Sequence, residues 1–79
     1  MHWIIKNGEG KPIDPEQFKK DWENLNISKG VLFEQDGFNP ITAVRVYIYE
    51  TRKEDLIRQN ITEAIPILIG YGYKVEEIE

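Results

Sequence analysis

The chain has 79 residues, a formal net charge of −4 and no cysteine. Because a chain of this length buries roughly 60 % of the surface that its unfolded form exposes, we expect a single domain, residues 1–79, of modest stability. The lack of cysteine excludes disulfides and thiolate metal sites. The acidic balance and the scattered basic residues argue against nucleic acid as a partner, since phosphate contacts need clustered lysine and arginine.

Two features of the sequence predict a soluble, cytoplasmic protein with no membrane partner. The first residues, MHWIIKNGEGK, lack the apolar run of a signal peptide. The longest stretch without a charged residue, 64–73, is far shorter than the ~20 apolar residues that cross a bilayer. The absence of cysteine also fits an intracellular setting.

The first elements are expected to be a strand and a helix. Residues 2–6 are short and β-prone, and the glycines and proline that follow end the strand. Asp14 has the position of a helix N-cap, Pro15 suits the first helical residue, and Gln17 has capping-box spacing. The helix is predicted from about Pro15 to Asn24. Its apolar face carries Phe18, Trp22 and Leu25.

Two more strands are predicted next. Residues 31–35 form the second strand and residues 41–50 the third, with a loop at 36–40. The third strand alternates most clearly, and β-branched side chains pack well on one face of a pleated strand. The residues of this strand that are expected to face the helices are Val44, Val46 and Ile48.

The second helix has a clear start. Residues 51–54 have the Thr-x-x-Glu spacing of a capping box, so the helix is expected to begin near Arg52. One stripe of this helix is apolar at helical spacing. It consists of Ile57, Ile61, Ala64 and Leu68.

The end of the second helix is ambiguous, because Pro66 removes a helical hydrogen bond and clashes with the preceding turn. In the alternative we favour, the helix kinks there and runs to Ile69, with Gly70 as its left-handed terminator. In the other, it stops near Ala64 and residues 65–69 form an extra strand.

Residues 73–78 form the last predicted strand, so the element order is β-α-β-β-α-β. This order predicts an α+β fold of the ferredoxin-like kind, a two-layer sandwich. A four-stranded antiparallel sheet would have its first and third strands in the centre and both helices on one face. The arrangement obeys the rule that crossover connections are right-handed.

The open face of this sheet is the candidate functional surface. Arg45, Tyr47 and Tyr49 alternate with the apolar residues of the third strand, and Lys74 on the last strand joins them as a candidate partner-binding residue. Three interpretations remain open. The tyrosines could stabilise an exposed sheet, bind a protein or a second copy of the chain, or stack on single-stranded nucleic acid. Residues 41–50 contain no glycine, so the aromatic signature of RNA-recognition strands is absent.

No pattern in the sequence predicts catalysis, a cofactor or a metal site. His2 is the single histidine, Ser28 is the single serine, and no motif surrounds either residue. We expect His2 to be a solvated residue near the chain start. The segment 7–11, NGEGK, lacks the GxxxxGK[ST] spacing of a phosphate loop and is expected to be a turn.

The sequence therefore predicts a small, acidic, non-enzymatic protein-interaction module that binds through the open sheet face. It could act as an inhibitor or regulator of a larger protein, or as a homodimer. Seven acids against four bases in the last thirty residues also suit docking on a basic partner. Single-stranded nucleic-acid binding through the tyrosines is the alternative function.

Overall fold

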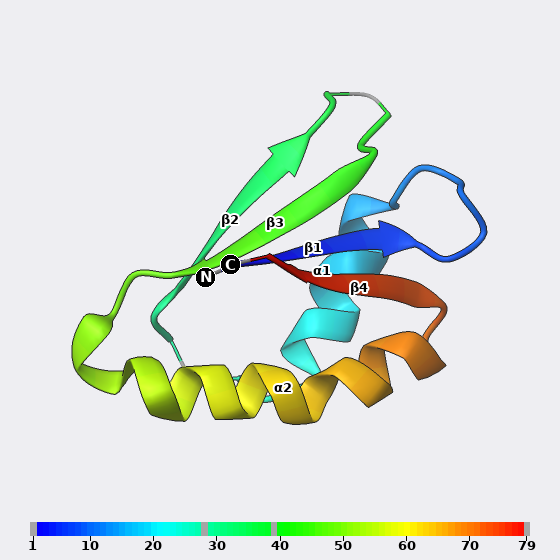
Figure 1. The fold of residues 1–79 in the computed structure, drawn as a ribbon. Coiled ribbons are helices and arrows are strands. Elements are labelled where there is room, and N and C mark those ends of the chain that lie inside the picture. The colour runs from blue at the N-terminus through cyan, green and yellow to red at the C-terminus, as the bar shows by residue number, and fades with distance from the viewer. Residues whose placement is uncertain (1, 28, 39, 79) are drawn as a thin grey trace.

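The computed structural model describes residues 2–27, 29–38 and 40–78. Within these residues a four-stranded antiparallel sheet is combined with two α-helices, which confirms the predicted α+β class (Figure 1). In chain order the elements are β1 (His2–Asn7), α1 (Pro15–Glu23), β2 (Val31–Asp36), β3 (Ala43–Ile48), a 3₁₀ helix η1 (Thr51–Lys53), α2 (Glu54–Gly70) and β4 (Tyr73–Ile78).

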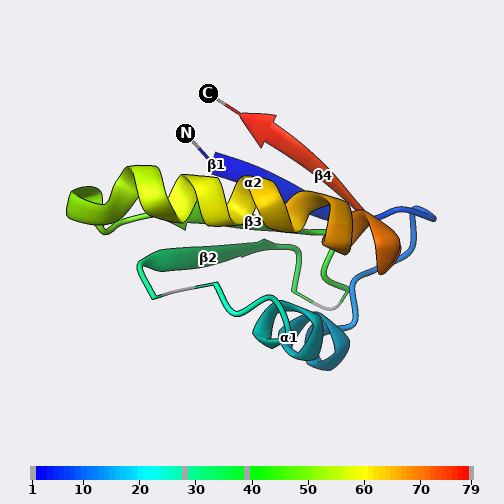
Figure 2. The ribbon, with the colours of Figure 1, turned by 90° about the horizontal axis from the view of Figure 1, so that it is seen from below.

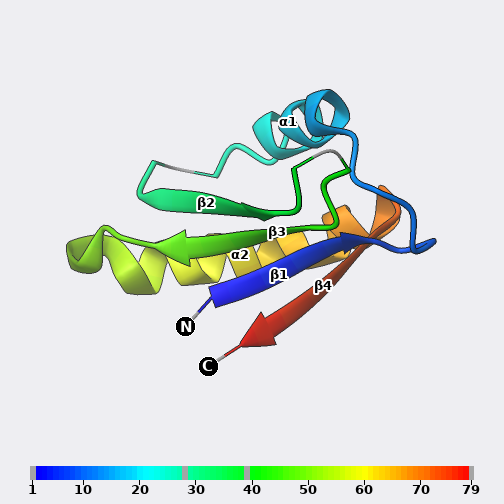
Figure 3. The same cartoon turned by 90° about the horizontal axis from the view of Figure 1, so that it is seen from above.

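The order of the strands in the sheet is β2-β3-β1-β4, so β3 and β1 are central. Helix α2 runs across the sheet next to β1 and β3 (Figures 2 and 3). Helix α1 packs on the same face, because its Trp22 meets Phe33 of β2 and its Asp21 accepts a hydrogen bond from Tyr73 of β4. Side chains from α1 and α2 enter one core. Phe18 of α1 and Ile57 of α2 belong to the same buried cluster.

The core lies on the face of the sheet that meets the helices. Trp3 and Ile5 of β1 stand opposite Val46 and Val44 of β3, and the side chains of these four residues are buried. Since successive side chains of a strand point to opposite faces, the alternation of β1 and β3 decides which residues enter the core. The expected inward positions of β3 are confirmed, with Ile48 partly buried against the same cluster.

Helix α1 begins as the sequence predicts. An Asp14 carboxylate oxygen accepts hydrogen bonds from the backbone N–H groups of Glu16 at 3.0 Å and Gln17 at 3.3 Å. The helix ends at Glu23, one residue before the predicted limit. The capping-box role of Gln17 is wrong, because its side-chain amide donates to Asp21 at 3.0 Å, one turn further along the helix.

The start of α2 differs from the expected capping box. The side chain of Glu50, rather than that of Thr51, accepts a hydrogen bond from the backbone N–H of Arg52, at 3.3 Å. A short 3₁₀ helix forms first, and the α-helix follows at Glu54 with no side-chain cap from Lys53. The side-chain cap lies one residue earlier than predicted, because the Glu50 carboxylate, like the Thr51 hydroxyl, can accept from the first free backbone amides.

The helix continues through Pro66 to Gly70, so the extra strand at residues 65–69 is wrong. The favoured alternative, a helix that continues through Pro66, is confirmed, but it runs one residue past the predicted Ile69. Its terminator is not Gly70, which lies inside the helix. The residue with a left-handed backbone is Gly72, with φ of +102°, directly before β4. The predicted stripe of α2 is confirmed, since the buried residues of this helix are Ile57, Ile61, Ala64 and Leu68.

One buried polar contact joins α1 to the last strand. The phenol of Tyr73 donates a hydrogen bond of 2.7 Å to the carboxylate of Asp21, which is only 8 % exposed. Burial raises the pKa of Tyr73 above its usual value, and the hydrogen bond to Asp21 raises it further. The contact holds together segments 52 residues apart in the chain.

Replacing Ile61, one of the fully buried residues of α2, should lower the free energy of unfolding. We expect Ile61→Ala to cost about 2–5 kcal/mol, through lost burial and the cavity that remains. Ile67→Ala is the matched control on the same helix, because Ile67 is 48 % exposed and should change stability by about 0.5 kcal/mol or less. Chemical denaturation measures both values, and equal losses would contradict the described burial of the helix.

The contact between Tyr73 and Asp21 should make stability depend on pH in the alkaline range. The pKa of the Tyr73 phenol is raised above its usual value of 10.0 in the folded chain. Above pH 10, the folded state therefore binds more protons than the unfolded state. Stability should therefore fall as the pH rises above about 10.

Tyr73→Phe should cost about 1–3 kcal/mol at neutral pH, because buried Asp21 loses a donor. It should also weaken the alkaline loss of stability. Thermal unfolding from pH 7 to 11 measures both effects, with Tyr49→Phe as the control at an exposed tyrosine. The same alkaline slope in Tyr73→Phe and the unmodified chain would refute this role for the phenol.

Candidate functional site

The face of the sheet opposite the helices carries one row of apolar and aromatic side chains. The strand registers place Leu32 of β2 opposite Tyr47 of β3, Tyr47 opposite His2 of β1, and His2 opposite Ile78 of β4. These four residues are called the open-face row below. Because directly opposed side chains on one face lie close enough to touch, the row forms a continuous strip across the described strands.

The centre of the open-face row is a pair of stacked rings. The imidazole of His2 and the phenol ring of Tyr47 have centroids 4.8 Å apart and planes inclined by 24°. Both residues are partly buried, and in the described part of the chain Nε2 of His2 has no hydrogen-bond partner. The expectation that His2 is solvated is therefore wrong: its place in the β1–β3 ladder fixes it against Tyr47.

A charged row borders the open-face row. Glu34 of β2 lies opposite Arg45 of β3, which lies opposite Ile4 of β1, which lies opposite Glu76 of β4. Arg45 donates from Nε to a carboxylate oxygen of Asp36 at 3.1 Å, and this neighbour raises the pKa of the Arg45 guanidinium. The guanidinium is thus oriented by its own chain at the border of the apolar row.

The structure spreads the predicted partner-binding residues along the sheet. Arg45 and Tyr47 lie on the open face, as expected from their alternation, and Lys74 is exposed on β4 opposite Lys6 of β1. Tyr49 lies beyond the end of β3 and is 61 % exposed. Lys74 is four positions along the ladder from the open-face row, about 13 Å at the usual rise per residue.

A hollow of about 330 Å³ with several charged lining residues lies on the open face near the other end of β1. Its basic side chains come from Lys6, Lys11 and Arg45, and its acid is Asp36. Lys11 pairs with Glu9 at 3.1 Å, and Arg45 pairs with Asp36, so these two cations are already neutralised by neighbours.

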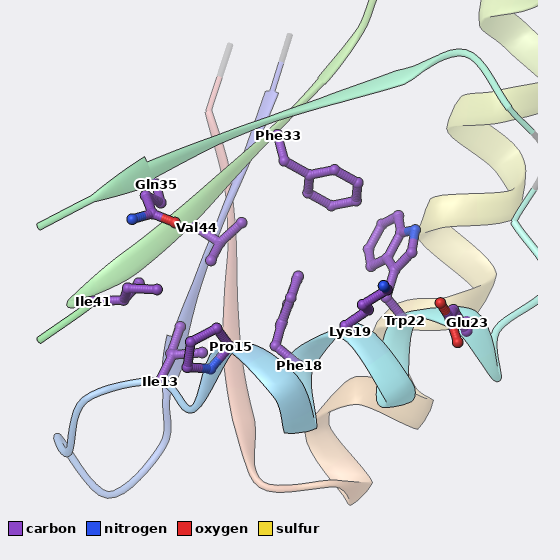
Figure 4. A pocket seen from close by; sticks show the side chains of 10 residues that line it. All are labelled: Ile13, Pro15, Phe18, Lys19, Trp22, Glu23, Phe33, Gln35, Ile41 and Val44. Atoms are coloured by element: carbon purple, nitrogen blue, oxygen red, sulfur yellow. The ribbon is translucent and has the colours of Figure 1, made fainter. Parts of the chain in front are cut away.

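A second surface, an apolar groove between α1 and β2, lies on the helix side of the sheet. Its volume is about 430 Å³, and its lining residues are Ile13, Pro15, Phe18, Lys19, Trp22, Glu23, Phe33, Gln35, Ile41 and Val44 (Figure 4). The ring of Phe33 points from β2 toward α1 and meets the indole of Trp22 edge-on, with centroids 4.9 Å apart. Phe33 remains 44 % exposed.

Sequence reasoning missed both His2 and this groove. His2 becomes part of the site through the register between β1 and β3, which no local pattern specifies. The groove had a local signal, because Leu32 and Phe33 are adjacent apolar residues on a strand that alternates poorly, so one of them must be exposed. Its position beside Trp22 depends on how α1 packs.

The described residues contain no group of three or more His, Asp or Glu side chains that could hold a metal ion. Neither α1 nor α2 is long and apolar enough to span a membrane. Comparison with protein-family models, with curated proteins and with solved structures found no match to this chain.

Proposed function

We propose that the chain is a non-enzymatic protein-interaction module that recognises a protein partner through the open sheet face. The observation that carries this proposal is the open-face row, Leu32-Tyr47-His2-Ile78, which lies across the sheet on the face that the helices leave free. Its centre, the stacked pair of His2 and Tyr47, is an aromatic surface that is ordered in the free chain. Binding through this pair would therefore cost less side-chain conformational entropy.

The composition of the face supports a protein as partner. Interfaces combine a central apolar and aromatic patch with a polar rim, and tyrosine and arginine are enriched among the residues that dominate binding energy. Here Leu32 is 49 % exposed next to Tyr47, and Arg45, Glu34 and Glu76 form the charged border. The net charge of −4 favours a basic partner, for which the chain would act as an inhibitor or regulator.

We also propose that the chain has the ferredoxin-like arrangement of the α+β class. The β-α-β-β-α-β order along the chain and the sheet order β2-β3-β1-β4 support this assignment. The arrangement matters for function because it leaves the open face to solvent while α1 and α2 supply the core.

Single-stranded nucleic acid is the second candidate ligand of the same face. The observation in its favour is the direct opposition of Lys6 and Lys74, since like charges across a ladder repel each other and a phosphate between them would relieve the repulsion. The protein partner is preferred because Arg45 is paired with Asp36 and the ring of Tyr47 already stacks on His2.

Truncating Tyr47 or Leu32 of the open-face row should abolish partner capture. We expect affinity-tagged Tyr47→Ala and Leu32→Ala to lose a host protein that the unmodified chain retains from lysate, because the ring and its neighbour supply the patch. Ile69→Ala is the matched control, since Ile69 is 56 % exposed but lies on α2, on the helix side. Quantitative mass spectrometry measures the retained proteins. Equal capture by the open-face variants and by Ile69→Ala would contradict the open face as the binding surface.

Oligonucleotides separate the two candidates. We expect a single-stranded DNA or RNA 12-mer at low salt to leave the amide resonances of β1 and β3 unchanged, because the chain is acidic and Arg45 is paired. Binding that disappears in Lys6→Glu and Lys74→Glu, and weakens steeply with salt, would establish the nucleic-acid function instead.

A further inference from the structure

The outer strands of the sheet, β2 and β4, have different protection against pairing with another strand. Charged side chains blunt an exposed edge, and β4 carries them throughout, at Lys74, Glu76 and Glu77. In β2 the charged residues, Glu34 and Asp36, are confined to the second half, whereas the first half presents Val31, Leu32 and Phe33. The strand contains no lysine and no proline. Among the described strands, β2 is therefore the edge suited to receive a partner strand.

The backbone groups that β2 offers are specified by its register with β3. The N–H of Tyr49 donates to the carbonyl of Gly30 at 2.9 Å, so this opposed pair is a hydrogen-bonded one. In an antiparallel ladder, hydrogen-bonded and non-hydrogen-bonded pairs alternate. The backbone N–H and C=O groups of Val31, Phe33 and Gln35 therefore point away from β3, toward the outer edge.

The apolar groove lies directly beside this edge. Helix α1 packs on the helix side of the sheet, and its Trp22 meets Phe33 of β2 from below the strand in Figure 4. A strand added next to β2 would lie beside this groove, and its helix-side residues would face it. A partner strand at this edge could therefore pair with the outward backbone groups of β2 and cover the apolar groove at the same time.

We propose that the occupant is β2 of a second copy of this chain. The two strands pair antiparallel about a two-fold axis at Phe33, which joins the two sheets into one continuous sheet. Phe33 then faces its own counterpart, and Val31 of each copy faces Gln35 of the other. The outward backbone groups of all three residues are paired, and the two Phe33 rings close the grooves from both sides.

Charge selects this register from its neighbours. With the axis at Phe33, Glu34 lies opposite Leu32 of the other copy, and Asp36 lies opposite Gly30. An axis at Glu34 would oppose the two Glu34 carboxylates, and an axis at Gln35 would oppose Glu34 and Asp36, and both arrangements are destabilised by like-charge repulsion. An axis at Leu32 avoids the repulsion but moves the partner of Gln35 out of the strand, to Lys29.

Helix α1 is self-complementary in the same arrangement. Lys19 and Glu23 are four residues apart, so they lie on one face of the helix, and both line the groove. In a two-fold interface each contact occurs twice, with residue i of one copy meeting residue j of the other. Lys19 of each copy can then face Glu23 of the other, whereas the open-face row remains free on the opposite side of the sheet.

Sedimentation equilibrium of the unmodified chain over a concentration series is the first measurement. The proposal predicts a reversible transition from monomer to twice the monomer mass. Amide hydrogen exchange supplies a second readout, because protection at Val31, Phe33 and Gln35 should increase with concentration, while protection at Leu32 and Glu34 should not. A chain that stays monomeric up to its solubility limit would overturn the proposal.

A charge exchange at Phe33 tests the axis itself. Phe33→Lys and Phe33→Glu should each be monomeric, because equal charges would meet at the axis, and a one-to-one mixture should recover the dimer mass. Failure of the mixture to dimerise, when each variant alone is monomeric and folded, would overturn the proposed axis.

Gln35→Pro tests the edge without changing the apolar cluster, since it removes an outward N–H group but no bond to β3. Gln35→Ala is its matched control, because it loses the same side chain and keeps the N–H. The proposal predicts a monomer for the first and a dimer for the second. If either Phe33 variant does not fold, as judged by circular dichroism, the two Gln35 variants provide the test of the dimer. Dimers of unchanged stability in Gln35→Pro would show that another surface pairs.

Discussion

The packing of Trp3 against Val46 under the helices is the constraint on which the rest of the structure depends. These two fully buried residues stand opposite each other in the β1–β3 ladder. A slip of one residue would exchange the faces of the sheet, so burial of this pair specifies the register. The same register places His2 against Tyr47 on the far side. The core and the candidate binding surface are thus two sides of one pairing.

Much of the fold could be predicted from the sequence because its signals are local. The limits of β4, the stripe of α2 and the cap at Asp14 follow from periodicity and from hydrogen bonding within one turn. The errors occur where nearby groups compete for the same partner. Glu50 rather than Thr51 caps the turn before α2, and Gln17 bonds forward to Asp21 rather than back to the helix start.

The candidate site was predictable only in part, because its residues come together through long-range pairing. The alternation of β3 alone indicated that Arg45 and Tyr47 share the open face. It could not show that His2 covers the tyrosine ring or that Arg45 is held by Asp36. The groove beside Phe33 likewise depends on how α1 packs against β2, which is a matter of tertiary packing. The residue types of β3 indicated which face of the sheet is the candidate surface, and the strand register determined which other side chains lie on it.

The adjacency of β1 and β4 has a practical consequence for handling the protein. His2 lies opposite Ile78, so the first residue of β1 and the last residue of β4 lie side by side in the sheet. Figure 1 shows these two strands next to each other. A fluorophore or surface tether attached next to His2 or Ile78 would crowd the stacked rings of His2 and Tyr47. The exposed turn at residues 8–11, at the opposite end of β1, offers an attachment point remote from them.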